Sequence, residues 1–299
     1  MTSRIDAGQR QDDKEGNRVR WHFATAAFGT INYRLAAERL SREANQLGLF
    51  KSVNAIREAE ATKLIPSYWS SHKAQLSSRV PGYGWFGWKP PLIQALLDLI
   101  GEGEGLVYLD AGCVLRTDAE SRLRLDEHLQ LAEGVGVLGA KSDNPLFVEE
   151  IYSSAEFMDQ LGLSLEMRKS TQYAGGILLV LNSEDGRSLV EEWCDWTQRD
   201  NQRYLKYEAS RSRIPNADGF VGHTLDQAVL SGLLKMRHAD FIDYDDLENV
   251  KGRPICAFRH RYGYDYFDAG SLTRVAYQGL GLASRARLFA IRRILGGYR

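Results

Sequence analysis

Asp110 is the residue best placed to bind a ligand or take part in a reaction, because it ends a short apolar segment and precedes two small residues, Ala111 and Gly112. In parallel α/β sheets, ligands bind beyond the carboxyl ends of the strands. A carboxylate there can hold a hard divalent cation or a ribose hydroxyl, and small neighbours let a bulky anionic ligand approach the backbone. An aspartate also caps ordinary turns, so the position alone leaves both interpretations open.

Residues 82–90 combine four aromatic side chains with three glycines. Aromatic faces stack on sugars and bases, and glycines let a loop close over a ligand. Lys89 precedes an expected helix start at Pro90 and is placed to meet a phosphate there. The alternative is a hydrophobic anchor beneath a loop.

Two shorter segments carry weaker signals. Gly175 and the glycine after it lead into the apolar run 176–181, which indicates backbone close to a ligand or to another strand. Asp226 and Gln227 open a helical pattern for which Thr224 is the expected N-cap. Acidic residues are also common in the first turn of ordinary helices, so this pair has a purely structural alternative.

His260 and Arg261 follow another apolar run, at residues 255–258. An imidazole can ligate a metal, and an arginine can face a phosphate. A lone histidine usually has a structural role, so this pair becomes informative only together with the other segments.

The hydrophobic pattern predicts the scaffold that must position these residues. An apolar strand at 21–28, a helix ending at Gly48 and a strand at 50–56 form a strand-helix-strand unit, which indicates a parallel sheet. One α/β domain is expected over residues 19–270, between a polar tail at 1–18 and a C-terminal tail at 271–299. Its further elements are a helix beginning at Pro90 and Pro91, strands at 106–109, 135–140, 176–181, 241–244 and 255–258, and helices at 185–201 and 224–236.

Composition excludes several classes of protein. The chain has 299 residues, 43% hydrophobic and 26% charged, which is typical of a globular protein. A net charge of −1 argues against a nucleic-acid partner. No secretory signal or membrane-spanning run is visible, and the three cysteines form no CxxC pair, so a reducing, cytoplasmic setting is expected.

Taken in order, the segments resemble the GT-A glycosyltransferases, most closely the glycogenin-like and bacterial lipooligosaccharide galactosyltransferase branch. Residues 109–112 resemble its Leu-Asp-Ala-Asp motif and residues 173–176 its Asn-Ala-Gly motif. Residues 226–230 match Asp-Gln-x-x-Leu, and residues 260–263 match His-x-x-Gly. The chain also resembles a polysaccharide-associated subgroup with an Asp-Ala-Gly motif.

The resemblance implies a GT-A (Rossmann-like) fold with a mixed, mainly parallel sheet flanked by helices. It implies hexose transfer, with retention, from a nucleotide-diphosphate sugar, expected to be a UDP-sugar, to a glycan or glycolipid acceptor in bacterial surface polysaccharide synthesis. Asp110 and His260 would hold Mn²⁺ or Mg²⁺, while Asp226 and Gln227 would lie by the anomeric carbon; Asp226 acting as a base would mean inversion instead. The implied donor contacts are Ala24, Thr25, Lys89, Asp110, Ala111, Gly112, Gly175 and Arg261.

Three departures from the family pattern leave rival functions open. Gly112 stands in place of the second motif aspartate, Tyr173 in place of the asparagine, and Tyr266 in place of a late lysine. One rival is a non-catalytic module that binds a nucleotide sugar. Another is a different nucleotide-dependent transferase, such as a nucleotidyltransferase, although residues 25–30 hold one glycine where such enzymes usually have a glycine-rich loop.

The C-terminal tail is basic and apolar. Residues 269–299 contain six arginines and no acidic residue, with leucines, isoleucines and a phenylalanine among them. This composition is typical of a helix that lies on an anionic membrane surface. A peripheral position at the inner membrane face is expected, and the alternative is a helix that packs on the domain or on a partner.

Overall fold

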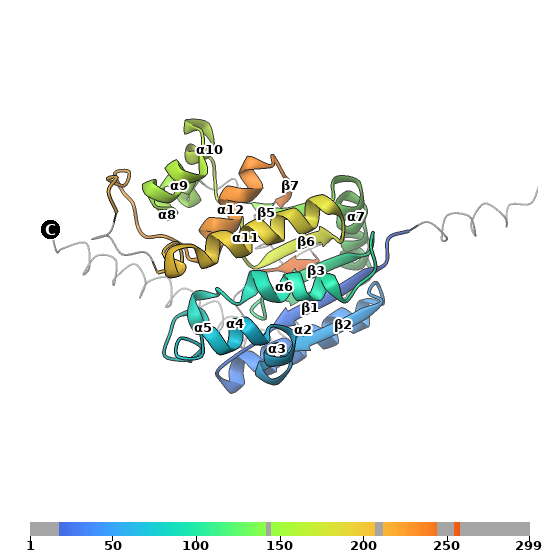
Figure 1. Cartoon of the computed structure of the whole chain (residues 1–299). Helices are drawn as coiled ribbons and strands as arrows, with labels where there is room; N and C mark the ends of the chain where they lie inside the picture. Colours follow the sequence, from blue (N-terminus) through green and yellow to red (C-terminus); the bar gives the residue numbers. More distant parts are fainter. Residues whose placement is uncertain (1–17, 142–144, 207–211, 244–253, 258–299) are drawn as a thin grey trace, which may run out of the picture.

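A six-stranded sheet forms the centre of the molecule, with the strand order β2-β1-β3-β6-β5-β7 (Figure 1). The computed structural model describes residues 18–141, 145–206, 212–243 and 254–257. The six strands are β1 (Trp21–Ala26), β2 (Ser52–Ile56), β3 (Gly105–Leu109), β5 (Val137–Lys141), β6 (Ile177–Leu181) and β7 (Asp240–Asp243). A separate two-stranded sheet pairs β4 (Val114–Leu115) with β8 (Ile255–Cys256).

Pairing in the main sheet is mixed. β1 runs parallel to β2 and β3, and β5 runs parallel to β7. β6 is antiparallel to both of its neighbours, β3 and β5. The mixed, mainly parallel α/β sheet expected from the sequence is therefore confirmed.

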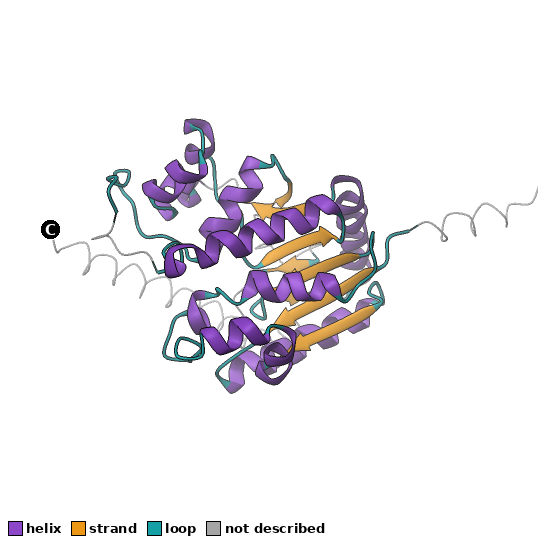
Figure 2. Ribbon diagram, in the orientation of Figure 1, coloured by secondary structure: helices purple, strands orange, loops and turns teal. Residues whose placement is uncertain are grey.

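Helices cover both faces of this sheet (Figure 2). The side chains of α6, α11 and α12 pack with Leu106 and Tyr108 of β3 on one face, whereas α2 and α7 pack with Val107 and Leu109 on the other. The helices are α2 (Ile31–Leu47), α3 (Glu58–Leu64), α4 (Pro66–Ser71), α5 (Gly82–Trp85), α6 (Lys89–Asp98), α7 (Ala119–Val135), η1 (Pro145–Phe147), α8 (Glu149–Tyr152), α9 (Ala155–Leu161), α10 (Leu165–Lys169), α11 (Glu184–Gln202) and α12 (Asp226–Met236). In the part of the chain described here, no helix has the length and apolar character needed to span a bilayer.

The topology identifies one edge of the sheet as a place for ligands. β1 and β3 are adjacent and parallel, and their connections run toward opposite edges, from β1 to β2 and from β3 toward β5. In open α/β sheets such a reversal leaves a crevice beyond the carboxyl ends of the two strands. Asp110 directly follows β3 and therefore lies at this crevice.

Some elements differ from the sequence predictions. α12 begins at Asp226 rather than Thr224, because the Thr224 hydroxyl donates to Gln172 Oε1 (3.0 Å) and does not cap the helix. Leu225, the residue between them, has φ 55° and ψ −131°, a conformation that is costly for a side chain with a Cβ. α7 was not predicted, since its exposed Leu123 and Leu131 blur the apolar stripe. His260, Arg261, the tail at 271–299 and residues 1–17 of the N-terminal tail lie outside the described residues.

Candidate active site

Four segments that are distant in sequence meet around the ammonium group of Lys89. Its Nζ lies 3.1 Å from Asp110 Oδ1 and 2.9 Å from Asp226 Oδ2. The same nitrogen donates to the carbonyl oxygen of Gly175 at 2.9 Å. The structure thus brings together Lys89, Asp110, Gly175 and Asp226, which the sequence analysis singled out separately.

Burial distinguishes the two carboxylates. The side chain of Asp110 is 36% exposed, so a ligand can reach it, whereas that of Asp226 is 4% exposed. Burial raises the pKa of Asp226 to about 6, although the nearby Lys89 ammonium works in the opposite direction. Burial alone would lower the pKa of Lys89, but Asp110 and Asp226 outweigh it and hold that pKa above its ordinary value.

Local structure fixes the position of Asp110. Its backbone N–H donates to the Gly176 carbonyl (2.9 Å), and the Tyr108 hydroxyl donates to Oδ1 (3.2 Å). Its carbonyl accepts from the Cys113 N–H (2.8 Å), which closes a turn over Ala111 and the half-buried Gly112. The expected strand end followed by a small-residue turn is therefore present.

A buried ion pair that the sequence analysis missed supports this turn. Arg39 Nη2 donates to the carbonyls of Cys113 (2.8 Å) and Ala111 (3.3 Å), while Arg39 Nη1 pairs with Glu43 at 2.8 Å. Glu43 in turn accepts the Leu115 N–H at 2.9 Å. The available signal was the pair of opposite charges four residues apart on the buried face of α2.

The glycines at 175 and 176 are required by close approach to the site. A Cβ at Gly176 would lie 2.7 Å from Asp110 Oδ2, and a Cβ at Gly175 would lie 2.8 Å from Cβ of Gln227. Both separations are shorter than real Cβ contacts allow. The predicted close approach of this backbone is thus explained by Asp110 and Gln227 themselves.

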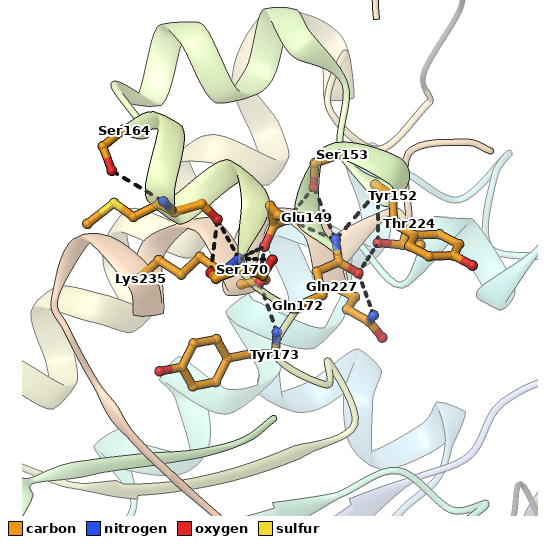
Figure 3. A network of polar contacts seen from close by, with 12 residues as sticks. Glu149, Tyr152, Ser153, Ser164, Ser170, Gln172, Tyr173, Thr224, Gln227 and Lys235 are labelled. Atoms are coloured by element: carbon orange, nitrogen blue, oxygen red, sulfur yellow. Dashed lines mark hydrogen bonds and ion pairs between the residues drawn. The ribbon is translucent and has the colours of Figure 1, made fainter. Parts of the chain in front are cut away.

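Gln227 belongs to a chain of polar contacts that leads through Gln172 and Glu149 to Lys235 (Figure 3). Its Oε1 accepts the Gly175 N–H (3.2 Å), and its Nε2 donates to Gln172 Oε1 (2.8 Å). Gln172 Nε2 donates to Glu149 Oε1 (2.9 Å), and Glu149, fully buried, pairs with Lys235 Nζ at 2.9 Å. Burial lowers the pKa of Lys235, and Glu149 opposes that change. In this structure Gln227 therefore positions backbone at residue 175.

Tyr173 takes no part in the cluster around Lys89. Its hydroxyl donates to the Ala239 carbonyl, and its N–H donates to the Ser231 hydroxyl at 2.9 Å. The ring points away from Gln227 (Figure 3) and is buried against Phe241. The residue that stands in the place of the family asparagine is thus part of the core.

The aromatic segment mainly anchors the loop before α6. Trp88 and Tyr83 both pack on Phe28, as a hydrophobic anchor would. Phe86 lies against the site, with its ring centroid 4.8 Å from Lys89 Nζ. Every residue from Gly82 to Phe86 has a positive φ, so this turn is left-handed and strained at its non-glycine positions.

The two residues predicted for the nucleoside pocket are fully buried. Ala24 pairs with Tyr108 across β1 and β3, and its side chain lies in the core. The Thr25 hydroxyl is also buried and finds no hydrogen-bond partner among the described residues. Ala111 packs with Ala27 at the same ends of the strands. The side chains of these residues are therefore buried below the molecular surface at this end of the strands.

A divalent cation does not fit the described residues by themselves. Within the described ranges, no three histidine, cysteine, aspartate or glutamate side chains come close enough together to hold a metal. Both oxygens of Asp110 already lie within 3.3 Å of the Lys89 ammonium. The Mn²⁺ or Mg²⁺ site of Asp110 and His260 stays a prediction, because His260 lies outside the described residues.

Comparison with known proteins gives distant structural likeness. No protein-family model and no curated protein matches the chain. Mouse xyloside xylosyltransferase 1, in its apo form, is similar over 75% of this chain and 85% of its own, with 14% identity and a TM-score of 0.41. The apo glycosyltransferase GlyE of Streptococcus pneumoniae TIGR4 is similar over 89% and 61%, with 13% identity and a TM-score of 0.41. UTP-bound UGPase from Acinetobacter baumannii is similar over 93% and 99%, with 8% identity and a TM-score of 0.38. Likenesses this distant assign neither a site nor an activity.

A shallow cavity of about 360 Å³ lies elsewhere on the molecule. It is lined by residues of β1, β2, β3, α3 and α6 and by the residues just after α6, among them His22, Lys63 and Leu99, and by none of the predicted site residues. The convergence of charged groups around Lys89 therefore identifies the candidate site better than this hollow does.

Proposed function

We propose that this protein is a GT-A glycosyltransferase that takes a sugar from a nucleotide-diphosphate donor. One observation carries the proposal: a reachable carboxylate, Asp110, lies beyond the carboxyl end of β3 at the crevice beside β1, held by Lys89 and facing Gly176. Crevices of this kind bind nucleotides, and a fixed carboxylate accepts hydrogen bonds from sugar hydroxyls. The motif order that resembles the GT-A enzymes supports the same activity.

In the proposed reaction, the bond between the anomeric carbon and the diphosphate oxygen breaks, the acceptor hydroxyl oxygen bonds to that carbon, and the hydroxyl proton passes to the leaving diphosphate. Asp110 orients the donor by accepting from a hydroxyl of its ribose or sugar. Gln227 acts through the Gly175 backbone, which it holds by a 3.2 Å hydrogen bond. Asp226, buried behind Lys89, balances the ammonium charge and keeps Lys89 in place. Negative charge grows on the leaving diphosphate, and Arg261 is the cation proposed to meet it.

We assign UDP as the nucleotide and a hexose as the transferred sugar, from the branch that the motifs resemble. The acceptor is a glycan or glycolipid of a bacterial surface polysaccharide, and the reaction takes place at the inner face of the membrane. The basic composition of residues 269–299 supports that location.

A thermal-shift panel of UDP-, GDP-, CMP- and dTDP-sugars tests donor binding on the full chain. A ligand at ~100 times its dissociation constant adds ~2.7 kcal/mol to the free energy of unfolding, which shifts the midpoint measurably. We expect the UDP-sugars to give the largest shift, and Asp110→Asn to reduce it. No shift with any nucleotide sugar would contradict the proposal.

Turnover of a labelled donor then separates a transferase from a binding module. We expect release of the nucleotide and transfer of the label to an added glycan or glycolipid. Tight binding of a donor without release of nucleotide, under every acceptor tested, would favour the non-catalytic alternative.

A further inference from the structure

Lys89 is enclosed, and oxygen atoms of three residues surround its ammonium group. An ammonium group carries three N–H bonds. The Nζ of Lys89 donates to Asp110 Oδ2 (3.3 Å) and to the Gly175 carbonyl (2.9 Å), and it forms an ion pair with Asp226 Oδ2 (2.9 Å). The residue itself is 1% exposed. The ammonium group of Lys89 therefore contacts oxygen atoms of the protein itself rather than a bound phosphate.

The acceptors around this nitrogen are of the types that a hard divalent cation takes as ligands. Mg²⁺ and Mn²⁺ prefer carboxylate and carbonyl oxygens. Two carboxylates and one carbonyl converge here, and the ammonium stands at their meeting point. Phe86 closes one side of it, with its ring centroid 4.8 Å from Nζ, where an aromatic face favours a cation.

The sequence at the end of β3 fits the same interpretation. Gly112 provides no second carboxylate on the turn after Asp110. The carboxylate that meets Asp110 across the site comes instead from Asp226 on α12, and Lys89 bridges the two. A divalent ion added at Asp110 would have to bind beside a fixed positive charge, which repels it.

We propose that Lys89 takes the place of a divalent cation in this protein: its ammonium joins Asp110, Asp226 and the Gly175 carbonyl, so that Asp110 is oriented for a ligand without a metal. Lys89 is in this sense a positioning residue, because it acts on the ligand through Asp110. The part of the proposal that concerns nucleotide-sugar binding rests on the proposed function, whereas the part that concerns metal does not.

Mn²⁺ titration of the full chain, followed by the electron paramagnetic resonance signal of free Mn²⁺, tests the metal part without any nucleotide. The variant Lys89→Met removes the ammonium and leaves two carboxylates and a carbonyl facing one space. We expect Lys89→Met to bind Mn²⁺ at least ~10-fold more tightly than the wild type, because the oxygens lose their competing cation. The double variant Lys89→Met/Asp110→Asn should lose this gain, and Lys89→Arg, which keeps the charge, should show none.

Two results would overturn the proposal. One is a Mn²⁺ site in the wild type that Asp110→Asn abolishes, since Asp110 would then ligate a metal despite Lys89. The other is a folded Lys89→Met protein that gains no Mn²⁺ affinity. If Lys89→Met does not fold, as thermal unfolding would show, the comparison of wild type with Asp110→Asn decides alone.

Binding of UDP-sugar with EDTA and with Mn²⁺ separates this proposal from the proposed function. Equal affinity under both conditions supports both. Binding that requires Mn²⁺ overturns the role of Lys89 and leaves the glycosyltransferase proposal standing. Absence of binding under both conditions counts against the proposed function, and the Mn²⁺ titration still decides the role of Lys89.

Discussion

Gly176 lies directly against the carboxylate of Asp110, so that a Cβ on residue 176 would come within 2.7 Å of Oδ2. Asp110 directly follows β3 and Gly176 directly precedes β6, its antiparallel partner, and the Asp110 N–H donates to the Gly176 carbonyl at 2.9 Å. A residue with no side chain is thus built into the wall of the site. The sequence pattern alone indicates that the backbone at Gly176 lies close to another group. The structure identifies that group as the carboxylate of Asp110.

Gly176→Ala should therefore displace Asp110 and weaken ligand binding. Overpacking of this kind costs about 1–3 kcal/mol of stability, so the protein should still fold. The measurement is the thermal shift produced by UDP-sugar in wild type and variant. Gly134→Ala is the matched control, because its Cβ meets nothing within 4 Å in α7, and it should be neutral or stabilising by about 0.4–1 kcal/mol. Unchanged binding in Gly176→Ala would show that Asp110 does not need this position.

Arg39→Met should be strongly destabilising, because it leaves Glu43 buried without its cation and two carbonyls of the turn without their donor. Removal of one partner of a buried pair typically costs about 3–5 kcal/mol. Urea unfolding of Arg39→Met and of the double variant Arg39→Met/Glu43→Leu measures this. The double variant should recover part of the loss, although the Leu115 N–H then lacks its acceptor. A single variant as stable as the wild type would contradict the assigned role of the pair.

The central strands β3 and β6 were predictable because they are continuous apolar runs. β3 and β6 are buried along their whole length apart from a half-buried last residue in β6, and a buried strand of this kind is visible in the sequence without any partner. The direction of β6 was not predictable, because an apolar run buried on both faces reads the same in either orientation. α7 was missed for the opposite reason, since exposed Leu123 and Leu131 hide its buried stripe.

Four residues that the sequence singled out, Lys89, Asp110, Gly175 and Asp226, meet in the structure, but the geometry of their meeting was not predictable. Lys89 was expected to meet a phosphate because it begins α6, a local feature. Its actual partners, Asp110 and Asp226, are 21 and 137 residues away in the sequence, and no local pattern records such contacts. Glu149 was missed for a related reason: its partner Lys235 meets it only after α8 and α12 pack together, and Gln172 comes from the segment between α10 and β6.

Gln227→Ala should slow sugar transfer much more than it weakens donor binding. The variant removes the acceptor for the Gly175 N–H and the donor to Gln172, so the backbone beside Lys89 is free to shift. A misplacement of about 1 Å can cost ~10²-fold in rate, and we expect a loss of that size in kcat. Gln130→Ala on the exposed side of α7 serves as the control. Equal turnover in Gln227→Ala and Gln130→Ala would show that Gln227 only begins a helix.

The basic tail should attach the protein to anionic membranes. Each arginine near an anionic surface contributes ~1 kcal/mol at low salt, and residues 269–299 contain six with no acidic residue to oppose them. Co-sedimentation with vesicles that contain phosphatidylglycerol should therefore pellet the full chain, and salt should release it. A chain truncated after Asp268 should remain in the supernatant. If the truncated chain pellets as well as the full one at low salt, the tail is not the anchor.

The buried Asp226 should make stability depend on pH in a specific direction. Burial raises its pKa from 3.8 to about 6 in the folded state, against the effect of Lys89, and Asp110 is the other charged group that acts on it. Between these two values the folded protein holds a proton that the unfolded chain releases. The contribution of Asp226 to the free energy of unfolding must therefore fall as pH rises from about 4 to about 6, and then level off.

Urea unfolding of wild type and Asp226→Asn across this range isolates that contribution. The stability of the wild type relative to Asp226→Asn should decrease with rising pH up to about 6 and stay constant above it, because the asparagine does not titrate. Asp218→Asn, at an exposed position, is the control and should follow the wild type. The opposite result, a stability of the wild type that rises with pH relative to that of Asp226→Asn, would contradict the prediction. It would mean that Lys89 stabilises the charged carboxylate more than burial destabilises it, so that the pKa of Asp226 is lowered in the folded protein.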